Sequence, residues 1–527
     1  MATSGPETKG ESTHDSSNGT NPDNITSILT DTDTTNTDDL ILQANGHKPQ
    51  LHRQFNWLSA LGLGFSITNS WVGYLSNFGQ IMTYGGPRLV IVGLILAFLA
   101  QSIISIGLAE IGSAFPSSGG QYHFCFLLAP KRSRRFAAYV VGWISVVAWW
   151  VVTYVCLPLL ELVFLSGKRI VIPVFVASKK ISVICQVTLL ISIVGVAMTL
   201  FVPTGMHEHV QPPSFLVSPS AGETGWGSGV SWMLGICNAM YAFGGTDGAL
   251  HIAEEMQHPG RRVPQVIIAT LLIGLATTLP LFVALLLFSS DAKEIMGSPL
   301  PSAELIHQAT GSRAGTMFLI IWILIVYISC LPSQWVTSGR LAWAFARDNG
   351  TPFPRYFSAI SPTFQFPIRT TMAAFVFVLL YGLLYLASTT TFYSIITSAV
   401  LFLNITYAVP QGILLLRRAR SLLSSTSKMN TNMSILPPRY LNLGPLIGSF
   451  CNAFSILWII VLGIFVCFPP EIPVDLASAN YTPAVVVGIF GLIVLFWGLG
   501  GKKMFEGPRV EWEGLELGLR MRVRGKA

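Results

Sequence analysis

Long apolar segments, separated by short polar ones, fill the chain from about residue 57 to residue 500. A helix needs about 20 apolar residues to cross a hydrocarbon core, and segments of that length recur along the whole region. We expect spans at about 57–82, 88–112, 136–157, 158–178, 181–203, 229–253, 264–288, 314–338, 370–387, 390–412, 445–468 and 483–500. The pattern predicts an all-α polytopic membrane protein with about 12 transmembrane helices.

Composition supports this interpretation. Hydrophobic residues make up 51% of the 527 residues and charged residues only 11%, whereas soluble domains average about 25% charged. The seven cysteines are scattered singly in or beside apolar segments, which favours small core residues over a disulfide or metal framework. The net charge of +7 comes without a basic stripe with interleaved aromatics. No nucleic-acid partner, cofactor or metal is implied.

The chain divides into three parts. Residues 1–50 are rich in Ser, Thr, Asp and Asn with few apolar residues, so we expect a disordered cytoplasmic N-terminal tail. Residues 51–503 form the transmembrane domain, and 504–527 form a cytoplasmic C-terminal tail. Most of the 32 lysines and arginines fall on one side if the N-terminus lies in the cytoplasm and the spans alternate. The positive-inside rule then places both termini in the cytoplasm.

Two further features concern one short pair of spans and one external connection. Residues 136–178 are barely long enough for two spans, and Glu161, Lys168 and Arg169 interrupt the second, so the fourth span is expected to be shortened. The tripeptide at 480–482, NYT, falls in an external connection, which makes Asn480 a glycosylation candidate.

The stretch FGGTDG, Phe243–Gly248, lies near the middle of the span at 229–253. Glycine costs about 1 kcal/mol against alanine in a helix interior, and an unsatisfied backbone group in hydrocarbon costs several more. Non-helical backbone at that depth is tolerated where it lines a cavity. We therefore expect a broken helix whose freed amides and carbonyls face something polar.

A second candidate break lies in the first span, where LGLGFSITNSWVGYLSNFGQ (residues 61–80) mixes glycines and polar residues with apolar ones. Two weakened helices five spans apart fit an inverted 5+5 repeat with a ligand held between spans one and six. Close packing through small residues is the alternative. Asp247 is an intramembrane carboxylate and hence a functional-site candidate. It could be protonated, pair with a cation, or cap the second half-helix.

Charged residues follow at the cytoplasmic end of the same span. Glu254 and Glu255 precede Arg261 and Arg262 by one loop. An ionic gate or loop clamp, with Arg261 as a partner, explains these residues better than acid–base chemistry does. Glu110, near the cytoplasmic end of its own span, is expected to anchor that span at the interface.

Five motifs carry a family resemblance: FPSSGGQYHF (115–124), FGGTDGALHIAEEMQHPGRRVP (243–264), SPLPSAELIHQATGSRAG (298–315), RLAWAFARDNGTPFPRYFSAISP (340–362) and FWGLGGKKMFEGP (496–508). Together they resemble the fungal amino acid/choline permeases, which include the GABA and choline permeases, of the amino acid–polyamine–organocation superfamily. The resemblance implies a leucine-transporter-like permease domain at 51–503, with broken helices 1 and 6. It implies that these breaks bind the substrate through Ser66, Ile67, Thr68, Asn69, Phe243, Gly244, Gly245, Thr246 and Asp247.

The resemblance further implies a secondary active, proton-coupled importer of amino acids or GABA-like amines, at the plasma membrane or alternatively the vacuole. A choline or polyamine permease, and a nutrient sensor on a transporter scaffold, are the alternatives. An enzyme is not expected, because the chain has no HExxH motif and no nucleophile elbow. In some relatives a lysine deep in span five replaces sodium, but here Lys179 and Lys180 lie only at its edge. His258 stands where the family usually has asparagine.

Overall fold

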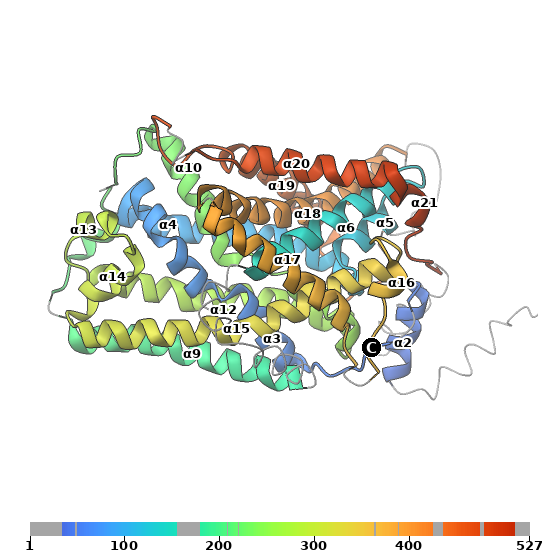
Figure 1. Ribbon diagram of the computed structural model, residues 1–527, viewed down its shortest axis with the longest axis horizontal. Coiled ribbons are helices and arrows are strands. Elements are labelled where there is room, and N and C mark those ends of the chain that lie inside the picture. The colour runs from blue at the N-terminus through green and yellow to red at the C-terminus, as the bar shows by residue number, and fades with distance from the viewer. Residues whose placement is uncertain are drawn as a thin grey trace, which may run out of the picture.

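The computed structural model describes residues 34–47, 50–154, 180–207, 209–219, 221–362, 365–387, 389–424, 436–474 and 479–511. Most of its helices run along the long axis of the molecule (Figure 1). Helices α2 (Thr34–Ala44) and α21 (Lys502–Met504) lie at one end, which we call the terminal end. Helices α13 (Ala292–Gly297) and α14 (Pro301–Thr310) lie at the opposite end, which we call the far end.

The long helices are α3 (Trp57–Thr68), α4 (Ser70–Ala114), α6 (Arg134–Tyr154), α9 (Ile181–Met206), α10 (Ser228–Ala239), α12 (Pro259–Leu287), α15 (Arg313–Arg347), α17 (Ile368–Ala387), α18 (Thr389–Ser424), α19 (Gly444–Phe465) and α20 (Thr482–Phe496). The shorter ones are α5 (Gln121–Leu128), α11 (Gly248–His251) and α16 (Pro354–Phe357), with 3-10 turns η2 (Pro213–Val217), η3 (Met240–Phe243) and η4 (Ala253–Glu255) and a π turn η5 (Trp497–Gly501). One isolated β-bridge joins Phe55 to Met256.

The hydropathy pattern identified the helices well, and the all-α membrane fold is confirmed. Within the described ranges, 8 helices are long and apolar enough to cross a membrane. Helix α4 contains the end of the first predicted span and the whole of the second, because Gly86 (φ 65°) and Pro87 bend it where the two were separated. The predicted span at 158–178 lies outside the described residues, so the count of twelve and the shortened fourth span stay predictions.

The interior is built around α4, which packs against α12 and α10, while α18 packs against α19 and α6. Large side chains fill the centre, among them Trp71 on α4 and Trp149 on α6, both fully buried. Helix α20 lies at the edge of the bundle (Figure 1), and most of its apolar surface is exposed. That surface suits contact with lipid.

Helix α2 lies inside the segment 1–50 for which the sequence predicted disorder. Its carboxylates Asp38 and Asp39 both bind the Arg53 guanidinium, at 2.6 and 2.5 Å, and Asp38 also accepts the His258 amide at 2.8 Å. The side chain of Ile41 is buried. Composition alone missed this order because the stabilising partners come from other parts of the chain. Residues 1–33 of the predicted tail lie outside the described residues.

Glu110 lies near the terminal end of α4 and is fully buried. Its two oxygens bind Arg418 of α18 at 2.8 Å and Arg439 at 2.6 Å, and one also accepts the Leu443 amide at 3.2 Å. Glu110 therefore ties α4 to α18 and to the segment leading into α19.

Candidate functional site

The first predicted break separates α3 from α4. Asn69 adopts the left-handed conformation (φ 34°, ψ 56°) between them. Its side chain is held by two neighbours, since Oδ1 accepts from Ser192 Oγ at 3.0 Å and Nδ2 donates to Cys330 Sγ at 3.3 Å. An interruption of this kind leaves the last carbonyls of α3 and the first amides of α4 without helical partners.

The second predicted break separates α10 from α11. Helix α10 tightens into η3, Gly244 is extended (φ −71°, ψ 156°), and Gly245 has φ +73°. A Cβ atom on Gly245 would lie 2.9 Å from Ile67 Cγ2, and one on Gly248 would lie 2.7 Å from Ile67 Cδ1. Glycine is required here by the backbone conformation at Gly245 and by the close approach of α3. Both broken helices are present, as the sequence predicted.

A cavity of about 50 Å³ lies between the two breaks. Six of the predicted site residues line it, namely Ser66, Ile67, Thr68, Asn69, Gly244 and Gly245. The lining also includes residues that the sequence interpretation did not single out, among them Tyr241, Tyr327, Cys330 and Gln334. None of the described residues that line the cavity carries a charge.

The other three predicted site residues do not line this cavity. The Phe243 ring packs against Phe98, with ring centroids 5.7 Å apart. The Thr246 hydroxyl lies 3.0 Å from the Ser105 hydroxyl. These two side chains, from η3 and the residues after it, therefore pack the second broken helix against α4.

Asp247 is buried among protein donors. Its Oδ2 accepts from Gln121 Nε2 at 2.6 Å, Trp149 Nε1 at 3.1 Å and His251 Nε2 at 3.1 Å, and its Oδ1 accepts from Tyr407 OH at 2.5 Å. The helix-capping alternative is wrong, because the Asp247 side chain makes no capping hydrogen bond to α11. The carboxylate instead joins the second broken helix to α5, α6 and α18. One sequence signal for a partner exists, since His251 follows Asp247 by one helical turn.

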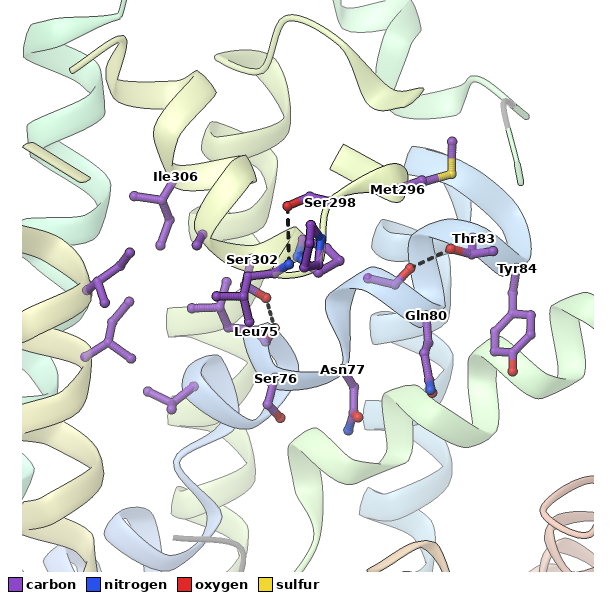
Figure 2. Close-up of a pocket in the computed structure, with 18 of the residues that line it drawn as sticks. Leu75, Ser76, Asn77, Gln80, Thr83, Tyr84, Met296, Ser298, Ser302 and Ile306 are labelled. Atoms are coloured by element: carbon purple, nitrogen blue, oxygen red, sulfur yellow. Dashed lines mark hydrogen bonds between the residues drawn. The ribbon is translucent and has the colours of Figure 1, made fainter. Parts of the chain in front are cut away.

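A larger hollow of about 720 Å³, here called the vestibule, lies toward the far end. Figure 2 shows Ser76, Asn77 and Gln80 of α4 beside Ser298 and Ser302 of the α13–α14 region. The Ser302 hydroxyl donates to the Leu75 carbonyl and so attaches α14 to α4.

Val72 and Tyr327 line both the vestibule and the cavity between the breaks. The two spaces therefore adjoin at these two residues.

The terminal end is closed beneath the cavity. Arg340 of α15 binds Glu255 through both Nε and Nη2, the latter at 2.7 Å. Gln54 Nε2 donates to Glu255 Oε2 at 2.6 Å, and the Phe55 amide donates to the Glu255 carbonyl at 3.0 Å. Glu255 thus joins α15 to the segment that precedes α3.

Glu254 makes a second bidentate pair, accepting from Arg347 Nη1 and Nη2, each at 2.9 Å, and it also accepts the Ser118 amide at 3.1 Å. Burial alone would raise the pKa of Glu254, but the Arg347 charge and its hydrogen bonds outweigh burial and lower this pKa to about 2. The carboxylate is therefore ionised at every physiological pH.

The predicted partner of these carboxylates needs correction. Arg261 does not pair with Glu254 or Glu255, because its guanidinium lies over the Tyr440 ring, 5.2 Å from the centroid. Both partners come instead from α15, 85 positions along the chain from Glu255 and 93 from Glu254. Sequence proximity favoured Arg261, whereas tertiary packing selects Arg340 and Arg347. A gating role for Arg261 stays a prediction.

Asn480, the glycosylation candidate, uses its side chain to organise the connection before α20. Nδ2 donates to the carbonyls of Val466 and Phe468, both at 2.8 Å, and Oδ1 accepts the Thr482 amide at 2.9 Å. A glycan would replace one hydrogen on that nitrogen and break one of these bonds. Glycosylation at Asn480 stays a prediction.

Comparison with known proteins adds four findings. The amino acid permease family model matches residues 55–492. A choline transporter of Saccharomyces cerevisiae is 30% identical over 489 residues, covering 86% of this chain and 83% of that protein. The swainsonine transporter swnT of Arthroderma benhamiae is 29% identical over 496 residues, covering 88% and 93%. A manganese transporter structure from Eremococcus coleocola aligns with a TM-score of 0.47 at 11% identity, covering 88% and 95%.

Proposed function

The chain belongs to the amino acid permease family, and we propose that it imports amino acids or GABA-like amines by proton-coupled, secondary active transport. The cavity between the two broken helices is the observation that carries this proposal. Helix ends in such breaks present partial positive charge at N-termini and partial negative charge at C-termini. A solute with both a carboxylate and an ammonium group complements both.

The uncharged lining supports the same substrate class. Gly244 and Gly245 expose backbone, and Ser66, Thr68 and Asn69 add neutral polar groups. A zwitterion can bind there without an ionised side chain, because peptide dipoles compensate its two charges. The predicted contact of Asp247 with substrate is not part of the proposal, since protein donors occupy the carboxylate.

Choline or a polyamine is the second candidate, and one observation favours it. Tyr241 and Tyr327 both line the cavity, and aromatic rings bind quaternary ammonium groups by cation–π attraction. A choline transporter of Saccharomyces cerevisiae is also among the relatives. A cation bound here would depend on these rings rather than on Asp247.

Alternating access would use the two ends of the cavity in turn. In this structure the vestibule reaches Val72 and Tyr327 from the far end, while Glu254 and Glu255 hold the terminal end shut. Placing the terminal end in the cytoplasm, as the distribution of lysine and arginine favours, makes this an outward-facing arrangement. Import would require Tyr327 to move aside so that the solute enters the cavity, then to close over it, and finally the two ion pairs to separate.

Uptake of radiolabelled solutes in cells that lack their own permeases tests the proposal. A neutral amino acid, GABA, choline and a polyamine are compared, each in competition with the others, against a Gly245→Leu control quantified at the cell surface. Preferred uptake of an amino acid or GABA supports the proposal, and preferred uptake of choline or polyamine selects the second candidate. Surface-localised chain that takes up none of them contradicts transport, and a fluorescent fusion distinguishes the plasma membrane from the vacuole.

A further inference from the structure

Both ring nitrogens of His251 face hydrogen-bond acceptors. Nδ1 lies 3.0 Å from the Ser118 carbonyl oxygen, and Nε2 lies 3.1 Å from Asp247 Oδ2. A carbonyl only accepts, so Nδ1 carries a hydrogen, and a neutral imidazole has only one. The contact between Nε2 and the carboxylate then needs one more proton. The Asp247–His251 pair therefore carries one proton more than a neutral histidine beside an ionised aspartate would carry.

The neighbours indicate where this proton lies. Trp149 Nε1 can only donate, and it shares Asp247 Oδ2 with the Gln121 amide, while the Tyr407 hydroxyl donates to Oδ1. Donors on both oxygens stabilise the ionised carboxylate. The arrangement is therefore an imidazolium on His251 against a carboxylate on Asp247, assigned from these contacts.

Among the described residues around the pair, no other positive charge balances the Asp247 carboxylate, so the proton is its balancing charge there. Tyr407 is the titratable group on α18, and Gln121 and Trp149 from α5 and α6 do not titrate. On the side of η4 and α15, Glu254 accepts the Ser118 amide and is itself neutralised by Arg347. From α3, Ile67 approaches Gly248. Loss of the proton would leave a buried, uncompensated negative charge on Asp247, which is strongly unfavourable.

We propose that the Asp247–His251 pair is the site that binds and releases the transported proton. This inference rests on the proposed function. The pair lies beside the cavity, since a Cβ on Gly245 would be 3.6 Å from Trp149, whose indole donates to Asp247. Helix α9 contains no lysine, aspartate or glutamate, so the lysine that serves some relatives in the fifth span has no counterpart within it.

The pair also connects parts that alternating access would move apart. Asp247 and His251 belong to the second broken helix, whereas their partners Gln121, Trp149 and Tyr407 belong to α5, α6 and α18. A proton arriving from the far end would bind between His251 Nε2 and Asp247, and it would pass to water once the terminal end opens. After release, His251 Nε2 and Asp247 Oδ2 would both be hydrogen-bond acceptors. They would repel each other, so the deprotonated pair would move apart.

Purified full-length chain in proteoliposomes tests this inference with two assays. One is accumulation of the solute found in the uptake screen, driven by a gradient of one pH unit. The other is counterflow exchange, which needs no net proton movement. With one proton per solute, a gradient of one unit supports an accumulation ratio of about tenfold, because a factor of ten is 1.4 kcal/mol. His251→Gln and Asp247→Asn should each lower the accumulation ratio to about one. The rate of counterflow exchange should fall much less in both variants, because exchange needs no net proton movement.

His123→Gln is the matched control, because His123 is equally buried, on α5. Burial, with a smaller contribution from His47, lowers the pKa of His123 to about 3, so this histidine carries no transported proton. Tyr407→Phe is a milder variant that removes one donor to Asp247. Loss of this donor destabilises the deprotonated Asp247–His251 pair more than the protonated one. The pH dependence of accumulation should therefore move to higher pH. A purely structural role of Tyr407 would not produce such a shift.

The outcomes separate the two proposals. Undiminished accumulation by folded His251→Gln chain, or an unmoved pH profile for Tyr407→Phe, overturns the inference. Wild-type chain that transports solute without responding to the pH gradient also overturns it and leaves transport standing. Wild-type chain that moves no solute at all refutes the proposed function itself.

Discussion

Gly245 is a position where backbone conformation and packing both exclude a side chain. Its φ is +73°, and a Cβ would lie 2.9 Å from Ile67 Cγ2. A left-handed conformation costs a non-glycine residue roughly 1–2 kcal/mol, and Ile67 would have to move out of the cavity lining. Gly245→Ala should therefore reduce the initial uptake rate about tenfold, since 1.4 kcal/mol is a factor of ten. Uptake is normalised to chain at the cell surface.

The control for this prediction is Gly229→Ala in the first turn of α10. No atom lies within 4 Å of a Cβ at that position, and α10 belongs to the same interrupted span. Uptake by this variant should match wild type. Equal uptake by the two alanine variants would show that the second break does not shape the transport site.

The sequence could predict the glycines but not the neighbours of Asp247. Helix-breaking residues inside an apolar segment are a local signal, and both breaks were predicted from it. The carboxylate's partners Gln121, Trp149 and Tyr407 lie 126, 98 and 160 positions away. Only folding brings those donors together, so the sequence left three roles for Asp247 open and the structure excluded capping.

At the scale of elements, η4 and α15 are joined by two buried ion pairs. Arg340 is fully buried against Glu255 and also lies over the Phe366 ring. Removing one partner of a buried pair costs about 3–5 kcal/mol. Arg340→Gln should therefore lower the unfolding temperature of the purified chain by several degrees, measured by thermal denaturation in detergent.

A double-mutant cycle checks that this loss comes from the pair. Glu255→Gln together with Arg340→Gln should be less destabilised than the sum of the two single variants, because the double variant leaves no charge unpaired. Additive losses would mean that the two side chains act independently. In that case the pair would not hold the terminal end shut.

The second ion pair predicts a pH dependence. The pKa of Glu254 falls from 4.5 to about 2 because the Arg347 charge outweighs burial. A depressed carboxyl pKa contributes stability that is complete above 4.5 and lost as pH falls through 2. The difference in unfolding temperature between wild type and Glu254→Gln should thus be equal at pH 7 and pH 5.5, and shrink below pH 4.5. A difference that already changes between pH 7 and 5.5 would contradict this pairing.

Hydropathy located helices because a span must satisfy its own backbone in lipid, which demands a long apolar segment. The same criterion overlooked α2, whose charged residues Asp38 and Asp39 are balanced by Arg53. Sequence proximity favoured Arg261 as the partner of Glu254 and Glu255, although the α15 arginines, which bear the same charge, are the ones that bind. Partner choice among like-charged side chains depends on tertiary distance.

At the scale of the whole molecule, the far end is hollow and the terminal end is closed, so solvent should reach the cavity from one side. Cys330 lines the cavity and is only 2% exposed, behind Val72 and Tyr327. In a chain that keeps Cys330 alone, a small membrane-impermeant thiol reagent added to intact cells should modify it slowly and inhibit uptake. Tyr327→Ala should speed the modification, because it removes the side chain between vestibule and cavity, and saturating substrate should slow it.

A cysteine placed in the vestibule is the control for access. Asn77 lines the vestibule but not the cavity, so Asn77→Cys should react readily whether or not Tyr327 is truncated. Modification of Cys330 only in inside-out vesicles would contradict the proposed orientation, with both termini in the cytoplasm. Modification at the same rate with and without Tyr327 would instead mean that this side chain does not separate the two spaces. The reagent reaches Cys330 and Asn77→Cys from the same side of the membrane. A difference between their labelling rates therefore reports the barrier at Tyr327 and not the orientation of the chain in the membrane.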